Sequence, residues 1–96
     1  MQSMSFNSRT TSTGTGTGVK ITIPIKTTNW ILHQCPGITY LERASLQRED
    51  GDLLVLKSPR LSKGNAGTRY IPIPKKDALA HGIVPGQMYS IKMEWQ

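Results

Sequence analysis

The chain has 96 residues, of which 36% are hydrophobic and 19% are charged, and this composition excludes a fully disordered protein. Twelve lysines and arginines against six acidic residues give a formal net charge of +6, which favours polyanionic partners such as nucleic acid. One cysteine, Cys35, excludes an intrachain disulfide bond, and no apolar run is long enough for a membrane-spanning helix. We therefore expect a cytoplasmic protein without membrane contact.

Residues 1–18 are predicted to be a flexible N-terminal segment that includes a first short strand over residues 4–8. Its second half, from Thr10 to Gly18, reads TTSTGTGTG, an uncharged low-complexity run that is typical of a flexible loop. A phosphate-binding glycine loop would need a helix after it, whereas the pattern that follows is that of a strand.

Residues 19–25 alternate between apolar and polar side chains, which predicts a half-buried strand that ends near Pro24. Residues 26–34 then suit a short helix of about two turns, with Thr27 or Thr28 as its N-terminal cap.

The next signals predict a strand and a hairpin. Pro36-Gly37 is expected to turn the chain into a strand over residues 38–46, with Tyr40 on its core face. Asp50-Gly51 then indicates a hairpin turn, and residues 53–56 are expected to form the short apolar strand that follows.

The same order of signals returns in the second half of the chain. A strand is expected from Arg69 to Pro74, a helix over residues 75–81 with Gly82 at its C-terminal end, and a turn at Pro85-Gly86. Residues 87–95 alternate strictly and predict a final strand, whose core face carries Tyr89, Ile91, Met93 and Trp95.

The two halves also correspond in spacing. Pro24 and Pro74 are 50 residues apart, and the two Pro-Gly pairs are 49 residues apart. We therefore predict one barrel domain over residues 19–96, built from repeat 1 (residues 19–57) and repeat 2 (residues 53–96). The expected fold class is mainly β with two short helices, arranged as a pseudo-twofold doubled barrel of β-β-α-β units. The alternative is that two commonplace Ile-Pro strands align by chance.

The segment GTRYIPIPKKDALAHGIVPGQMYSIKM, residues 67–93, resembles the AbrB/SpoVT/MazE family of swapped-hairpin DNA-binding domains. Gly82, Ile83 and Gly86 match the Gly-Ile-x-x-Gly turn of that family, and residues 19–57 look like a weaker copy without the Gly-Ile step. In that family two chains interlock into one barrel with a basic face, so two copies in one chain imply a single-chain equivalent. The same doubling also resembles the double-psi barrel, whose members include adaptor domains that bind no nucleic acid.

Basic residues gather where a nucleic acid would be expected to bind. From Leu53 to Lys76 there are six basic residues and no acidic one, and equivalent positions of the first half add three more. Among the aromatic residues, Tyr70 is the candidate for base stacking, whereas Trp30, Tyr40 and most others are assigned to the core. The candidate nucleic-acid-binding residues are Arg9, Lys20, Lys26, Lys57, Arg60, Lys63, Arg69, Lys75 and Lys76. The alternative is a solvated basic loop without a partner.

An enzymatic function finds little support. His33 and His81 have no acidic or thiolate company in the sequence, and there is no nucleophile motif or nucleotide fingerprint. We expect no catalytic residue, cofactor or metal. The leading hypothesis is a DNA-binding transcription regulator or nucleoid-associated protein that contacts double-stranded DNA, as a monomer or a homodimer. The alternatives are a protein-interaction module, either antitoxin-like or a double-psi barrel adaptor, and an RNA- or ribosome-associated protein.

Overall fold

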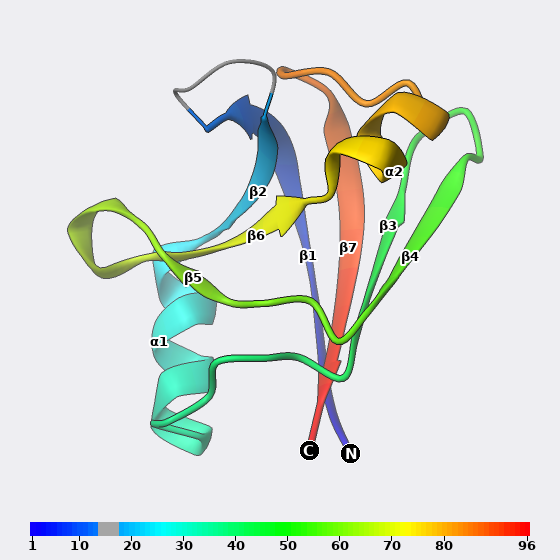
Figure 1. Ribbon diagram of the computed structural model, residues 1–96. Coiled ribbons are helices and arrows are strands. Elements are labelled where there is room, and N and C mark those ends of the chain that lie inside the picture. Colours follow the sequence, from blue (N-terminus) through cyan, green and yellow to red (C-terminus); the bar gives the residue numbers. More distant parts are fainter. Residues whose placement is uncertain (14–17) are drawn as a thin grey trace.

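The computed structural model describes residues 1–13 and 18–96, and their strands form one curled antiparallel sheet (Figure 1). The described part of the chain has seven strands, which lie in the order β4-β3-β7-β1-β2-β6-β5. The sheet curls into a half-barrel (Figure 1). They are β1 (Gln2–Ser12), β2 (Val19–Ile23), β3 (Arg43–Gln47), β4 (Leu53–Lys57), β5 (Ser62–Lys63), β6 (Arg69–Ile73) and β7 (Met88–Trp95). The two α-helices are α1 (Ile25–Gln34) and α2 (Lys75–Ala80), and a 3-10 turn covers Asn65–Gly67.

Strand β1 holds the two parts of the half-barrel together. Its first eight residues pair with β7, beginning with Gln2 opposite Trp95, and Thr10 to Ser12 pair with β2. The short strand expected over residues 4–8 is present and extends over Gln2–Ser12, so the flexible loop expected from Thr10 onwards is wrong for Thr10 to Ser12, because β2 supplies ladder partners for their backbone groups. Residues 14–17 of the predicted loop lie outside the described residues.

The core lies on the concave side of the sheet and follows the alternation of the strands. Ile21 and Ile71 are fully buried, and the predicted core face of β7 is confirmed, because its four residues are between 0% and 1% exposed. Each Ile-Pro strand leads directly into a helix, with Pro24 before α1 and Pro74 before α2. Proline at this point removes a backbone donor that the first helical turn would leave unpaired.

Two ladder registers join equivalent positions of the two halves. In the β2–β6 ladder Ile21 lies opposite Ile71, which is its counterpart by the spacing of the prolines. In the β3–β7 ladder Ala44 lies opposite Met93, which is its counterpart by the spacing of the Pro-Gly pairs. An antiparallel pair of equivalent residues is the arrangement expected where a twofold axis crosses a ladder.

The structure corrects three local predictions. The strand expected over residues 38–46 begins only at Arg43. Tyr40 is 58% exposed, and its segment pairs with the chain around Arg60 through an isolated bridge and neighbouring backbone hydrogen bonds. Trp30 is 40% exposed, and its ring lies edge-on to that of the buried Trp95. Thr28 does not cap α1, since the helix begins at Ile25 and the Thr28 hydroxyl donates to the Ile23 carbonyl at 3.2 Å.

No helix within the described residues is both long and apolar enough to cross a membrane.

Candidate nucleic-acid interface

Three basic side chains of the second half line one hollow on the surface. Arg60 and Lys63 come from the segment around β5, and Arg69 begins β6. The hollow has a volume of about 600 Å³, and its wall is completed by Tyr70 and by the segment that follows α1. None of the described residues that line it is acidic. Three cations therefore face one space without a neutralising side chain in its wall.

Lys63 and Arg69 lie directly opposite each other in the β5–β6 ladder. Like charges at opposed positions of neighbouring strands destabilise a sheet, because their side chains are held close together. The ion pairs found among the described residues involve Arg43, Arg48 and His81, and none includes Lys63 or Arg69. This arrangement favours an external anion between the two strands.

The turn that joins β5 to β6 is short and internally bonded. Thr68 donates to the Asn65 carbonyl through its amide at 3.1 Å and through its hydroxyl at 2.7 Å. Ala66 has a φ of 56° and Gly67 a φ of 79°, so the chain reverses through two left-handed residues. The turn fixes where Lys63 and Arg69 leave the sheet.

A second hollow, of about 390 Å³, adjoins the first at Arg60 and adds Lys57, Tyr40 and one acidic residue, Asp77. It opens where the chain leaves β4, since Ser58 has a φ of 49° and Pro59 cannot donate to a ladder. Tyr40 and Arg60 form an isolated antiparallel bridge, so their side chains leave the backbone on the same side. We call the two hollows together, with Lys57, Arg60, Lys63 and Arg69, the basic groove.

Lys20 joins this surface through Tyr70. Its ammonium lies 4.7 Å from the centroid of the Tyr70 ring, which is within the range of a cation–π interaction. Both residues point to the outer side of the β2–β6 ladder, where Lys20 lies opposite Pro72 and Tyr70 lies opposite Thr22. Lys20 therefore holds the Tyr70 ring in place beside Arg69.

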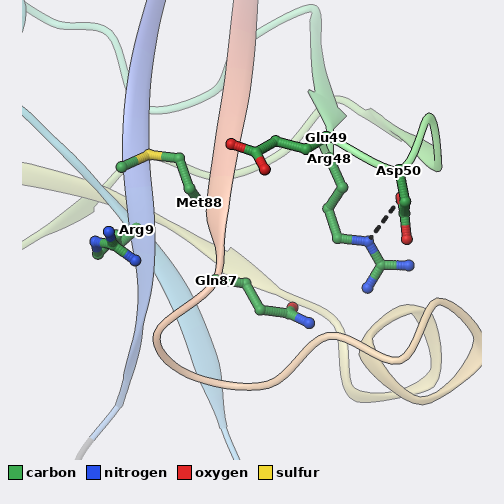
Figure 2. A pocket seen from close by; sticks show the side chains of 6 residues that line it. All are labelled: Arg9, Arg48, Glu49, Asp50, Gln87 and Met88. Carbon is green, nitrogen blue, oxygen red and sulfur yellow. Dashed lines mark ion pairs between the residues drawn. The ribbon is translucent and has the colours of Figure 1, made fainter.

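Arg9 lies at a different hollow, of about 430 Å³, which Figure 2 shows from close by. Its guanidinium donates to the Gly86 carbonyl at 3.1 Å, and the carboxylates of Glu49 and Asp50 face the same space. Arg48 closes the far side through its ion pair with Asp50. With two arginines and two acids in its wall, this hollow has no excess of positive charge.

Lys26, Lys75 and Lys76 lie in the first turns of the two helices. Strands β2 and β6 run antiparallel, so the last residue of β2 lies opposite Arg69. Helix α1 therefore starts at the end of the ladder where Arg69 lies, and α2 starts at the other end. The structure thus gathers Lys20, Lys57, Arg60, Lys63 and Arg69 on one surface. Arg9 lies at a different hollow, and Lys75 and Lys76 line neither hollow of the groove, although Pro74 and Asp77 on either side of them line the second, so the cations of the two halves do not form one symmetric set.

Three of the six acidic residues, Glu49, Asp50 and Asp52, lie at the β3–β4 hairpin, whereas Asp77 of α2 lines the second hollow of the basic groove. Asp52 accepts from His81 at 3.0 Å and forms an ion pair with Arg48 at 3.3 Å. Burial raises the pKa of Tyr89 beside this cluster, and the positive charge of Arg48 opposes part of that increase. In the part of the chain that the structure describes, no group of three His, Cys, Asp or Glu side chains is placed to hold a metal ion.

Tyr40 is the interface residue that sequence reasoning missed. Its apolar neighbours and its spacing from Ile38 indicate a buried position, and the local sequence contains no signal of its exposure. Only the long-range bridge to Arg60 places it at the groove.

No known protein family, curated protein or solved structure matches this chain.

Proposed function

We propose that the protein binds nucleic acid by neutralising backbone phosphates in the basic groove. The observation that carries this proposal is that Arg60, Lys63 and Arg69 line one hollow in which no described lining residue is acidic. Phosphate contacts from lysine and arginine supply most of the affinity of such complexes and fix the position of the ligand.

The distribution of charge supports the same proposal. The net charge of +6 attracts polyanions from a distance, and the acidic residues of the β3–β4 hairpin leave the β5–β6 side more positive still. The opposed Lys63 and Arg69 are destabilising without a ligand, and a phosphate between them would turn this repulsion into two attractions.

We also propose that the half-barrel is a doubled β-β-α-β fold of the AbrB-like swapped-hairpin or double-psi type. The opposed pairs Ile21–Ile71 and Ala44–Met93 support it, because both join equivalent positions. If the fold belongs with the AbrB-like domains, the protein is a DNA-binding transcription regulator or a nucleoid-associated protein. If it belongs with the double-psi barrels, a protein-interaction module is the competing function.

The proposal is tested by the salt dependence of binding. Fluorescently labelled duplex DNA, single-stranded DNA and structured RNA are titrated with the full chain, and anisotropy is followed at several salt concentrations. Three phosphate contacts predict that affinity falls about 40-fold for duplex DNA and about 18-fold for a single strand between 50 and 200 mM salt. Binding that does not change with salt, or no binding to any of the three, would overturn the proposal.

A matched pair of variants locates the interface. Arg60→Gln with Lys63→Gln removes two exposed charges from the groove, and Lys75→Gln with Lys76→Gln removes two exposed charges from α2. We expect the groove variant to lower the slope of log affinity against log salt by about 2, and the helix variant to lower it little. Equal losses in the two variants would show that net charge alone drives binding.

A further inference from the structure

We infer that the ligand of the basic groove is a single strand of nucleic acid, whose bases stack on Tyr40 and Tyr70 on either side of Arg60. This inference rests on the proposed function and deepens it. It follows from where the two rings lie, because each lines one of the two hollows that share Arg60.

The two tyrosines are surface residues, unlike the third tyrosine of the chain. Tyr40 is 58% exposed and Tyr70 is partly exposed, whereas Tyr89 is 1% exposed and belongs to the core. An exposed tyrosine ring gains little from folding, but it offers a flat face on which a base can stack. Two such rings in adjoining basic hollows match the pattern of aromatic platforms beside phosphate-binding cations.

The chain around Arg60 separates the hollows without closing either of them. In Figure 1 the connection from β4 to β5 crosses the molecule between β6 and the segment that leads from α1 to β3. Arg60 lies on this connection and is exposed, with Tyr40 bridged beside it. A strand laid across the connection would place a phosphate at Arg60 and its flanking bases towards the two rings.

The rings also discriminate between single strands and duplexes on physical grounds. The faces of the bases in a duplex are covered by their stacked neighbours, so an exposed tyrosine has nothing to stack on. A single strand can splay its bases and keep its phosphates on the cations. Lys20 strengthens this arrangement, because its ammonium holds the Tyr70 ring from one side.

Three probes separate stacking from charge: the single strand and the abasic strand carry the same number of phosphates, and the duplex carries twice as many. The probes are a mixed-sequence DNA strand of about 12 nucleotides, the same strand annealed to its complement, and an abasic strand of equal length. The full chain is titrated with each at one salt concentration and affinity is measured by anisotropy. We expect the single strand to bind about 10-fold more tightly than either of the other two, since stacking requires free base faces.

Tyrosine variants complete the test. Tyr40→Ala should lower single-strand affinity about 10-fold and leave abasic and duplex affinities unchanged, while Tyr40→Phe should retain the wild-type value. Tyr70→Leu, which keeps the volume of the partly buried side chain, should behave as Tyr40→Ala does. Leu79→Ala, an exposed change on α2, is the control, and circular dichroism confirms that each variant folds.

The outcomes distinguish this inference from the proposed function. Equal, salt-dependent binding of all three probes would overturn the stacking inference and leave phosphate binding intact. An equal loss of affinity for all three probes in a folded Tyr40→Ala variant would also overturn the stacking inference and leave phosphate binding intact. If none of the probes binds, the proposed function has failed, and the inference fails with it.

Discussion

Ile21 lies directly opposite Ile71 at the centre of the β2–β6 ladder, and both side chains are fully buried. Thr10 continues the same row on the other side of Ile21, so the row crosses three strands. This contact joins the first half of the chain to the second, and β7 and β5 flank the three strands of the row in the sheet.

We predict that Ile21→Ala and Ile71→Ala each lower the free energy of unfolding by about 2–5 kcal/mol, because each leaves a cavity at this row. The two effects should not add in the double variant, since the residues are in contact. Urea denaturation measures all three values. Val55→Ala, at an exposed position of β4, is the control and should change little. Additive losses would show that the two side chains do not share one cavity.

Thr10 is predicted to hold the turn before β7. Its buried hydroxyl donates to the Val84 carbonyl at 2.6 Å and accepts from the Gln87 amide at 3.0 Å. Thr10→Val should cost about 1–3 kcal/mol of unfolding free energy, because it leaves both groups without this partner. Thr10→Ser should recover most of the loss, and Thr11→Val, at an exposed neighbour, should have little effect. Equal stability of Thr10→Val and the wild type would contradict the role.

Arg43 and Glu94 make a pH-dependent contribution to stability. Arg43 donates to both carboxylate oxygens, at 2.9 and 3.2 Å. The hydrogen bond from Arg43 lowers the pKa of Glu94 below its ordinary value, desolvation opposes this, and the guanidinium charge adds to it. Since the folded-state pKa is depressed, the contribution is present above the unfolded pKa and is lost as the pH falls through the folded one.

The measurement for this pair is the thermal midpoint from about pH 7 down to about pH 3. We predict that Glu94→Gln lowers the midpoint at neutral pH and that its curve meets that of the wild type at the acidic end. In an Arg43→Gln background the same change should alter the pH dependence little. A constant difference between the curves at every pH would rule out ionisation of Glu94 as the cause.

Ala66 stores strain in the turn between β5 and β6. Its φ of 56° lies in the left-handed region, which costs an L residue with a Cβ about 1 kcal/mol or more. Ala66→Gly should therefore raise the unfolding free energy by about 1 kcal/mol, whereas the control Ala80→Gly, at the end of α2, should lower it by about 0.5–1 kcal/mol. Chemical denaturation compares the two. Destabilisation in both variants would show that the turn carries no such strain.

The elements that could be predicted from the sequence are those with a local cause. Strict alternation identified β7 and its core face, and an Ile-Pro strand before each helix identified β2, β6, α1 and α2 within a residue or two. The elements that could not be predicted depend on distant partners. Residues 38–42 look like a strand, but they pair with residues 58–61 only through an isolated bridge and a few backbone hydrogen bonds. Thr10 to Ser12 look like a loop, but they pair with β2.

The residues of the candidate site likewise differ in whether a local sequence pattern or a distant contact places them there. Arg60, Lys63 and Arg69 could be grouped from the sequence, because a short hairpin keeps them together. Lys75 belongs to the same basic run of the sequence, and Arg9 is grouped with it on the expectation of symmetry, but an antiparallel pair of equivalent strands sends equivalent positions to opposite ends. Tyr40 reaches the groove through a bridge that no local pattern reveals.

The pairing of Gln2 with Trp95 brings the first and last strands side by side, with the chain ends next to each other (Figure 1). A short linker would turn β1 and β7 into a covalent hairpin, and the exposed turn at Gly51 offers a place for new ends. Such a circular permutant would be synthesised with its second half first. If the fold depends on the contacts between the halves and not on their order along the polypeptide, this permutant keeps the same sheet.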